Sequence, residues 1–573
     1  MSYGKAKCNV SQHKPENTTG RRRLAGRFEL LGLVALVVAL LLPFLGRAFS
    51  IDDPLFIWMG QQILEFPLDP YGFSVNWSGI YRPMSEVMQN PPLNSYFIAG
   101  VIFLAGLSET VMHVAFLLPA IAAASGTYLV ARRFCARPLE ATLAAILTPA
   151  FLVCGSTVMC DMMLLAFWVW TIHFWVRGID DNNIWMIVLA SVLIVLSAWT
   201  KYYGVVLLPL LLVHSFLTRR KPGWWILGCL IPIAALIAYN YWTESIYSQR
   251  LMLDAFEFSG HYRAIRGMAL IPKSVITLAF AGGCLASVIF LAPLLWTRRV
   301  LAVWIGVGAL LNMLFFLTGT IGDYPLKLVN GERWILAAHL SLFAAGGASL
   351  LTLAIKDLAV NRDADSVLLF LWLAGTVVFV GLLNWTVNGR TLLPAAPALG
   401  IIMMRRIEQR RSESKMVAAP LFVLPWILSS LAAFSVAYAD CQFANSQRTA
   451  AYIIHQKFST SGTMWFQGHW GFQYYMERLG AKPLGYKGSI SAMNDIVVIP
   501  KNNTVIKALP NDSKAKRITV SSSKWLSTMN NYCGTAFHSD LWGPIPYGFG
   551  LTAPEIYDIL TVKEYKLSIQ SHN

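Results

Sequence analysis

Charged side chains stand at the ends of several long apolar runs in this sequence. Asp52 and Asp53 follow the first run, Asp161 and Lys201 interrupt later ones, and Arg390 precedes another. Charged groups inside or against membrane segments are costly and usually serve a function. A carboxylate can act as a general base, and fixed cations stabilise a phosphate leaving group. The set therefore favours the transfer of a group from a phosphate.

Two further connections between apolar runs carry charges that we expect on the same membrane face, and His261, Arg263 and Arg333 among them are expected to line the cavity with Asp161. They contribute His261, Arg263 and Arg266 in one connection, and Asp323, Lys327, Glu332 and Arg333 in the other. Each charge taken alone has a simpler explanation, because it could snorkel or pair at a helix end. That explanation is weaker for the whole set, because five separate connections place charged residues on the same side of the membrane.

Individual residues leave alternatives open. Asp52 and Asp53 lead into a helical stretch, where adjacent acids could serve as helix caps. Lys201 interrupts an apolar pair of helices and needs an anionic partner, because an unpaired ammonium there is expensive. A structural pair between Asp161 and Lys201 is the alternative to a catalytic role.

The composition requires a membrane protein. The chain has 573 residues, of which 56% are hydrophobic and 13% are charged, and its mean hydropathy is +0.52. Soluble proteins carry about 25% charged residues, so there are too few polar residues here to coat soluble domains. The net charge of +16 is explained by basic cytoplasmic loops, and we expect no nucleic-acid partner. A single soluble enzyme, a disordered chain and a fibrous repeat are excluded.

We predict a mainly α-helical polytopic bundle with about 13 crossings, each of roughly 20 mostly apolar residues. Residues 1–28 form a basic cytoplasmic tail, and residues 51–92 form the first external loop. The short apolar run 93–107 is read as a re-entrant or interfacial helix. The predicted crossings are 29–50, 111–131, 139–155, 161–177, 184–199, 203–217, 223–242, 273–296, 299–318, 334–354, 367–384, 391–404 and 417–439.

Basic clusters set the orientation. They lie at 132–137, 219–221, 298–299 and 405–411, and the positive-inside rule places all four in the cytoplasm. Asp161, Lys201 and Arg390 then face outward. We expect a multi-pass protein of the plasma membrane, the inner membrane of a bacterium, with membrane lipids as partners.

The character of the chain changes after residue 439. Residues 440–573 have shorter apolar runs separated by Lys, Asn, Ser and Gly, which predicts a small extracytoplasmic α/β domain. Cys441 and Cys533 fall in it, where a disulfide between them is possible. We interpret His469 and Trp470 as part of a compact aromatic turn rather than a ligand site.

Five short motifs resemble the polytopic GT-C glycosyltransferases, in particular family 39, which includes the protein O-mannosyltransferases and the lipid A aminoarabinose transferases. The resemblance covers roughly residues 29–440, so 29–439 is expected to be the transmembrane catalytic domain. The motifs are IDDPLFIWMGQQIL at 51–64, NPPL at 90–93, CDMMLLAF at 160–167, WTKYYG at 199–204 and GRTLLPAAP at 389–397.

The resemblance implies an inverting transfer of a sugar from a polyprenyl-phosphate carrier to an acceptor outside the cytoplasm. Asp52 matches the catalytic base of the family, and Asp53 stands where many relatives have Glu. Lys201 and Arg390 match positions that hold the carrier phosphate, and Asp161 matches an acid of the same cavity. Asn90 replaces a His or Lys of relatives, so it can donate a hydrogen bond to the phosphate but brings no charge.

No nucleotide diphosphate leaves in such a reaction, so we expect neither a metal nor another cofactor. The sequence has no Walker loop, dinucleotide fingerprint or His-Glu-x-x-His motif. Two alternatives stay open. The loop with His261 and Arg263 is compatible with a polymerase or ligase of lipid-linked glycans, and a transporter or flippase is the non-enzymatic alternative. The sugar, the acceptor and the oligomeric state are not encoded in a readable motif.

Overall fold

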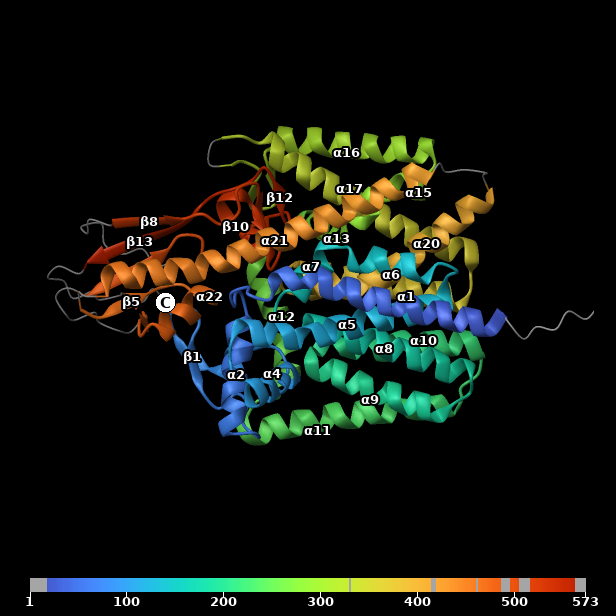
Figure 1. The fold of residues 1–573 in the computed structure, drawn as a ribbon, viewed down its shortest axis with the longest axis horizontal. Coiled ribbons are helices and arrows are strands. Elements are labelled where there is room, and N and C mark those ends of the chain that lie inside the picture. The colour runs from blue at the N-terminus through green and yellow to red at the C-terminus, as the bar shows by residue number, and fades with distance from the viewer. Residues whose placement is uncertain are drawn as a thin grey trace, which may run out of the picture.

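The structure is a computed structural model. It describes residues 18–328, 331–413, 419–459, 462–485, 495–503 and 516–561, and all statements below refer to these residues. The molecule is elongated, with long helices side by side along its length and a β-sheet at one end (Figure 1). The N-terminal part of α1 and the sheet lie at opposite ends of the bundle.

The membrane part is built from the apolar runs seen in the sequence. Its helices are α1 (Thr18–Leu41), α5 (Glu109–Phe134), α6 (Pro138–Ile146), α7 (Pro149–Gly155), α8 (Asp161–Asp180), α9 (Ile184–Thr200), α10 (Leu207–Arg219), α11 (Leu230–Tyr247), α12 (Leu251–Arg266), α13 (Leu270–Cys284), α14 (Ser287–Phe290), α15 (Ala292–Leu295), α16 (Arg298–Thr318), α17 (Trp334–Asn361), α18 (Ala364–Val378), α19 (Gly389–Leu392), α20 (Ala396–Glu413) and α21 (Ala419–Phe458). Short 3-10 helices at Leu42–Phe44, Tyr202–Val206, Trp224–Cys229 and Leu393–Ala395, and a π-helix at Phe379–Leu383, extend or join them.

The chain is an integral multi-pass membrane protein, but about 13 crossings are not confirmed. Within the described ranges nine helices are long and apolar enough to span a bilayer. The number rises to 11 if two bent pairs are each one span: α6 with α7, bent by 67°, and α12 with α13, bent by 117°. The 17-residue α9 falls below that length, and the second half of α20 carries several arginines. The connection 243–272, between the predicted crossings 223–242 and 273–296, consists largely of the helix α12.

The four basic clusters meet at one end of the bundle, which we call the basic end. Arg133 of α5 forms ion pairs with Asp180 and Asp365, at 2.7 and 3.0 Å. Arg219 donates to the carbonyl of Ile179. In the same region Arg405 pairs with Asp357 at 3.0 Å, and Arg410 donates to the carbonyl of Trp296 just before α16. The clusters therefore share one end, as the positive-inside rule requires.

The first external loop is compact. It contains α2 (Asp53–Glu65), a hairpin of β1 (Ser74–Asn76) and β2 (Tyr81–Pro83), and α3 (Met84–Val87). The next helix, α4 (Leu93–Ala105), packs against α2 and has 13 residues. At 1.5 Å per residue it is too short to cross a bilayer, as expected for the run 93–107.

The C-terminal region holds a five-stranded mixed sheet in the order β6-β5-β7-β13-β8. Its elements are β5 (Met464–Phe466), α22 (Trp470–Arg478), β6 (Lys482–Pro483), β7 (Ile496–Pro500), β8 (Lys516–Val520) and β13 (Glu555–Thr561). Between β8 and β13 lie four two-residue strands, β9 (Leu526–Ser527), β10 (Met529–Asn530), β11 (Thr535–Ala536) and β12 (Gly548–Phe549), with 3-10 turns at Asn531–Cys533 and Asp540–Trp542. A small hairpin, β3 (Thr320–Ile321) with β4 (Tyr324–Pro325), follows α16.

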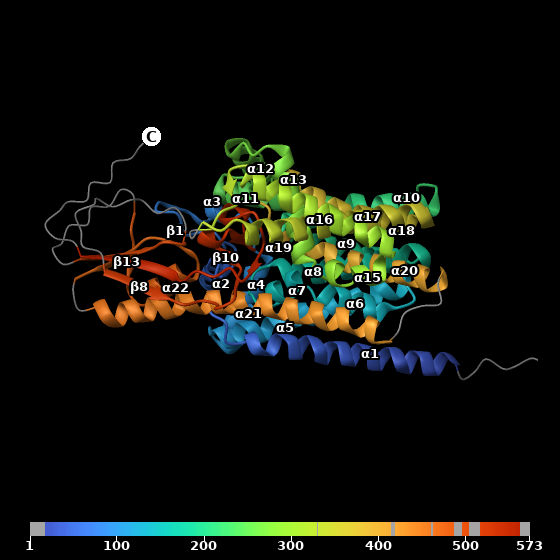
Figure 2. The same cartoon turned by 90° about the horizontal axis from the view of Figure 1, so that it is seen from above.

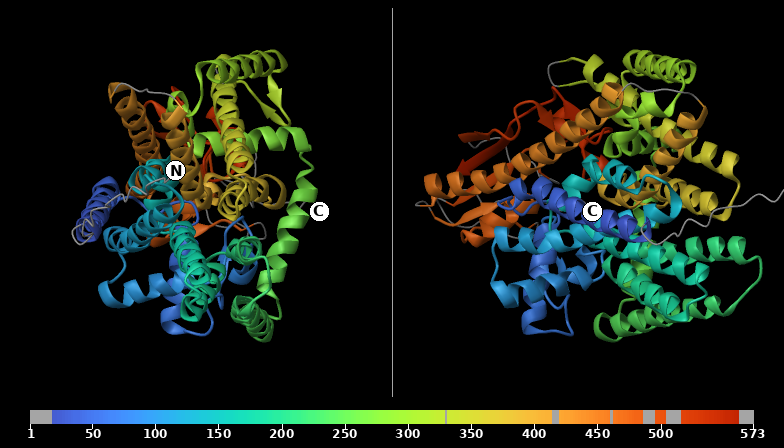
Figure 3. Two further views of the ribbon diagram at one scale, coloured as in Figure 1. Left: turned by 90° about the vertical axis from the view of Figure 1, so that its right-hand side faces the viewer. Right: turned by 45° about the vertical axis from the view of Figure 1, so that its right-hand side comes forward.

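The sheet region is not separated from the helices by a linker. Helix α21 runs unbroken through residue 440, the predicted start of the domain, and reaches from the bundle to the sheet (Figure 2). Phe537, Ile545 and Tyr547 are buried in the same hydrophobic core as the membrane helices. In the view from the basic end the red C-terminal segment lies behind the helices, and in the oblique view its strands lie beside the orange helix (Figure 3).

Candidate functional site

The site is organised around the N-terminus of α2, at the end of the bundle opposite the basic end. Asp52 is the residue that precedes α2, and Pro54 sits in the first turn, where its missing N–H costs nothing. The Asp52 side chain makes no capping hydrogen bond. Its Oδ2 instead lies 2.9 Å from Nη1 of Arg390, and the side chain is 27% exposed. Asp52 is thus an accessible carboxylate held beside a cation.

Asp53 has a different environment from the one expected of a catalytic acid. It is fully buried, and its two carboxylate oxygens accept hydrogen bonds from the backbone N–H groups of Ser50 and Val158, both at 3.0 Å. Burial raises the pKa of Asp53 to about 7, although the nearby Arg47 lowers it. Asp53 therefore fixes the start of α2 against the segment before α8, and a catalytic role for it, which the sequence suggests beside Asp52, stays a prediction.

Arg390 is presented by the short helix α19. Asn388 caps this helix, since its Oδ1 accepts the Thr391 N–H at 2.8 Å. Nη1 of Arg390 contacts Asp52 and also Sδ of Met159, while its Nε is buried without a hydrogen-bond partner. Burial lowers the pKa of the Arg390 guanidinium, but the Asp52 and Asp161 carboxylates raise it above its ordinary value. The guanidinium therefore stays charged and retains an unused donor.

Lys201 lies beside this pair. Its Nζ is 2.7 Å from Oδ1 of Asp161, the first residue of α8, and 3.4 Å from Oγ1 of Thr391. The Lys201 side chain is 20% exposed, and that of Asp161 is 2% exposed. The sharp turn after α9 depends on Gly204, where a Cβ would lie 2.5 Å from the backbone of Ser197. The structure thus brings Asp52, Arg390, Lys201 and Asp161 together, as the sequence predicts.

Four other predicted residues make their contacts elsewhere in the described part of the chain. The amide of Asn90 contacts Sδ of Met88 at 3.8 Å, and its carbonyl accepts the Tyr71 hydroxyl at 2.8 Å. His261 is exposed on α12 against Tyr262. Arg263 donates to the carbonyls of Ser259 and Leu382. Arg333 is exposed beside Gly319.

A buried polar network not expected from the sequence supports the site from behind. The fully buried Arg47 forms an ion pair with Asp440 of α21 at 2.8 Å and donates to Ser156 at the same distance. Asp440 also accepts hydrogen bonds from Thr528 and from Nε2 of His538, both in the C-terminal region. The sequence feature that points to this network is Arg47, because a charged residue at the end of an apolar run needs a partner.

The C-terminal region also braces α19. The Gly389 N–H donates to the Phe537 carbonyl at 2.8 Å. Asp540 accepts the Val387 N–H and pairs with Arg266 of α12, both at 2.9 Å. Gly389 is required there, because a Cβ would lie 2.7 Å from Sγ of Cys284 and 2.9 Å from Phe537. Residues 537–540 therefore fix the backbone immediately before Arg390.

Cys441 and Cys533 are free and buried, so the predicted disulfide is not formed. Cys441 lies on α21, where the Asn445 amide contacts its sulfur, and Cys533 lies in the 3-10 turn after β10. Both thiols are packed as small apolar groups in the core that joins helices and C-terminal region.

His469 lies close to the site from the C-terminal side. Its ring stacks on Trp77 with centroids 4.7 Å apart, and its Nδ1 is 2.9 Å from the Trp77 carbonyl. Burial lowers the pKa of His469 to about 4, and the charge of Asp52 acts in the opposite direction. The predicted aromatic turn is therefore present, with a neutral imidazole next to the Asp52 region.

Comparison with known proteins supports the resemblance. Residues 89–242 match the family model described as dolichyl-phosphate-mannose-protein mannosyltransferase, so the predicted similarity to the GT-C glycosyltransferases is confirmed. This segment contains Asp161 and Lys201. The match supports lipid-linked glycosyl transfer as the general class of reaction. No curated protein gives a significant match.

Two solved structures show overall similarity. The oligosaccharyltransferase AglB from Archaeoglobus fulgidus, in complex with an inhibitory peptide and a dolichol-phosphate, has a TM-score of 0.48 and 14% identity, covering 83% of this chain and 69% of its own. ArnT from Cupriavidus metallidurans, bound to undecaprenyl phosphate, has a TM-score of 0.43 and 15% identity, covering 84% of this chain and 94% of its own.

Proposed function

We propose that the chain is an inverting glycosyltransferase that moves one sugar from a polyprenyl-phosphate carrier to a hydroxyl of an extracytoplasmic acceptor. The observation that carries the proposal is the Asp52–Arg390–Lys201 arrangement. An accessible carboxylate lies 2.9 Å from one cation, and a second cation lies within reach of Thr391, the next residue along the chain. The proposal includes a plasma-membrane location with the basic end in the cytoplasm.

The three side chains have separate roles in the proposed reaction. Asp52 takes the proton from the acceptor hydroxyl as its oxygen bonds to the anomeric carbon of the sugar. The bond between that carbon and the phosphate oxygen breaks, and polyprenyl phosphate leaves with the bonding electron pair. Arg390 and Lys201 stabilise the charge that develops on the phosphate. The unpartnered Nε of Arg390 supplies a donor for this purpose.

Inversion also requires a change in the contact between Asp52 and Arg390. The base and the leaving phosphate act on opposite faces of the anomeric carbon, so the sugar must lie between the two side chains. The 2.9 Å ion pair is then a resting arrangement that separates when the donor enters. In that resting state, Arg390 holds the Asp52 carboxylate in place.

Analysis of lipids and external glycans by mass spectrometry tests this function. Cells that lack the chain should accumulate a polyprenyl-phosphate monosaccharide and lose a single sugar from a glycan, lipid or protein outside the cytoplasm. Accumulation of polyprenyl-pyrophosphate oligosaccharides would instead indicate a polymerase or ligase. Unchanged lipids and glycans would contradict the proposal. The positions of His261 and Arg263, away from Asp52, give the polymerase or ligase no added support.

A further inference from the structure

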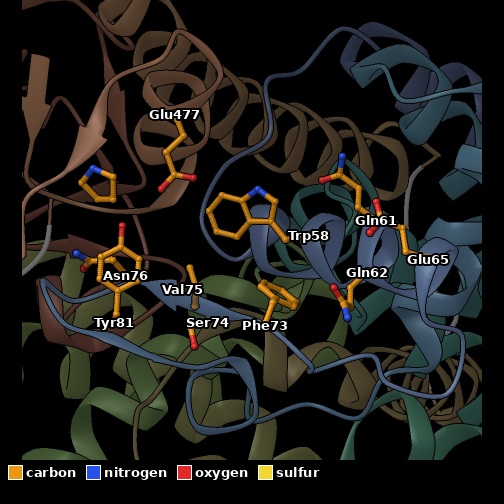
Figure 4. Close-up of a pocket in the computed structure, with 11 residues that line it drawn as sticks. Trp58, Gln61, Gln62, Glu65, Phe73, Ser74, Val75, Asn76, Tyr81 and Glu477 are labelled. Atoms are coloured by element: carbon orange, nitrogen blue, oxygen red, sulfur yellow. The ribbon is translucent and has the colours of Figure 1, made fainter. Parts of the chain in front are cut away.

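A cavity of about 460 Å³ lies between the far part of α2, the β1–β2 hairpin and the C-terminal region (Figure 4). It is separate from the charged cluster at the start of α2. Its lining residues are Trp58, Gln61, Gln62, Glu65, Phe73, Ser74, Val75, Asn76, Tyr81, Glu477 and Pro483. Its volume falls within the range of small-molecule sites, about 300–1,000 Å³.

The described lining combines aromatic rings with neutral amides and with carboxylates. Figure 4 shows Trp58 between Glu477 on one side and Gln61, Gln62 and Glu65 on the other. Among the described residues of the lining, Glu65 and Glu477 carry charge, and none is Lys, Arg or His. A phosphorylated or otherwise anionic ligand is therefore disfavoured.

The polar groups of this cavity are only partly satisfied within the protein. Asn76 is 4% exposed, and its Nδ2 has no hydrogen-bond partner. Gln473 joins the two walls, because its Nε2 donates to the Asn76 carbonyl and to Glu477. A buried donor without a partner is uncommon in a folded protein, and here it lies in the wall of the cavity, next to the amide of Gln473 and the carboxylate of Glu477.

Aromatic side chains lead from this cavity to His469, which lies near enough to Asp52 for the charge of Asp52 to raise the pKa of the imidazole. Trp58 follows Asp52 by six residues on the same helix, a rise of about 9 Å. Trp58 meets Trp77 edge-on with ring centroids 6.2 Å apart, and Trp77 stacks on His469 at 4.7 Å. A ligand of two or three rings could therefore occupy the cavity and still present a hydroxyl toward Asp52.

We propose that this cavity is the acceptor subsite and that it binds a saccharide that is neutral or carries an amino group. This inference rests on the proposed function, because it names the acceptor class for that reaction. The apolar C–H face of a sugar ring packs on Trp58 and Tyr81, since the face of an aromatic ring is electron-rich. Sugar hydroxyls donate to carboxylates and both donate to and accept from amides. A peptide acceptor offers fewer hydroxyl groups, so fewer of the clustered carboxylates and amides would gain a hydrogen-bond partner.

Saturation-transfer NMR on the full chain in lipid nanodiscs tests the subsite, with maltotriose and chitotriose as saccharide probes and a Thr-containing hexapeptide as the competing probe. Nanodiscs are needed because maltoside detergents carry the same class of ligand. The variants Gln61→Ala and Glu65→Gln change exposed side chains of the lining. Glu86→Gln removes an exposed carboxylate of α3 outside the lining and is the matched control. Binding of undecaprenyl phosphate is measured on each protein.

We expect saccharide binding by the wild type and by Glu86→Gln, and affinity about tenfold lower in both lining variants, which corresponds to one lost hydrogen bond. Undecaprenyl phosphate binding should be equal in all four proteins. Absence of saccharide binding, equal affinity in the lining variants, or binding of the peptide alone would overturn the inference. Loss of undecaprenyl phosphate binding by the wild type would contradict the proposed function while leaving the saccharide result interpretable.

Discussion

The Asp52 carboxylate and the Arg390 guanidinium are 2.9 Å apart, although 338 positions, 390 minus 52, separate them in sequence. This contact joins the start of α2 to the start of α19. It places an accessible carboxylate and a guanidinium in one site. The predictions below start from it and from the residues that hold it in place.

Replacing Asp52 by Asn should remove the general base. We expect the rate of glycosyl transfer to fall by about 100-fold or more, because general-base catalysis contributes at least that much, while binding of undecaprenyl phosphate persists. Initial rates and lipid binding on the purified variant measure both. Asp181→Asn, an exposed carboxylate at the basic end, is the control. A rate close to that of the wild type would refute the assignment.

The structural role of Lys201 and its proposed role in binding the substrate can be tested separately. Lys201→Met leaves the buried Asp161 without its 2.7 Å partner, and we expect a loss of roughly 3 kcal/mol in unfolding free energy. The double variant Lys201→Met with Asp161→Leu should recover the thermal stability but still bind undecaprenyl phosphate more weakly. If the double variant binds the lipid as well as the wild type does, the pair is only structural.

Arg47 and Asp440 should form the most consequential ion pair for stability, because both side chains are completely buried. Arg47→Met leaves Asp440 charged and without its guanidinium, and we expect a loss of about 3–5 kcal/mol. Arg177→Met breaks the exposed pair with Asp181 and should cost less than about 1 kcal/mol. Unfolding transitions in the same detergent compare the two. Similar losses in both variants would contradict this ranking.

The buried Glu555 should make the free energy of unfolding depend on pH. Burial raises its pKa to about 8, although Asn502 and Asn530 donate hydrogen bonds to it and lower the pKa. A carboxyl whose pKa is raised on folding contributes stability that is present at low pH and is lost as pH rises through the folded pKa. Relative to Glu555→Gln, the wild type should lose up to about 1.4 kcal/mol per pH unit between pH 5 and pH 8.

Thermal unfolding of both proteins at a series of pH values measures this difference. Gln can still accept the amide hydrogen bonds and never ionises, so the variant should be the more stable protein at pH 8. Parallel curves for the two proteins from pH 5 to pH 8 would show that Glu555 keeps an ordinary pKa.

Chelation should leave the reaction intact. Within the described residues no group of three or more His, Cys, Asp or Glu side chains is arranged to hold a metal ion, and two protein cations are available for the leaving phosphate. We expect unchanged initial rates in excess chelator. Complete loss of turnover that a divalent ion restores would contradict a metal-independent mechanism.

Much of the architecture could be predicted from local pattern. Apolar runs located the long helices, since a membrane helix must satisfy its backbone internally over about 20 residues. The predicted number of membrane crossings is less accurate, because the bends at α6–α7 and α12–α13 depend on packing rather than on hydropathy. Loop assignment alone predicts His261, Arg263 and Arg333 in the cavity. In the structure Arg263 of α12 donates to the carbonyls of Ser259 and Leu382, and Arg333 is exposed before α17.

Sequence by itself determined that the chain is a membrane protein, that its basic loops share one end, and that Asp52, Asp161, Lys201 and Arg390 are costly charges in need of partners. These properties follow from residue type and from distance along the chain. Only the tertiary structure decided which charge meets which. It buried Asp53 while leaving its neighbour Asp52 accessible, it kept Cys441 and Cys533 apart as thiols, and it set residues 537–540 against α19. The physical reason is that burial and pairing depend on contacts between segments hundreds of residues apart, which no local pattern records.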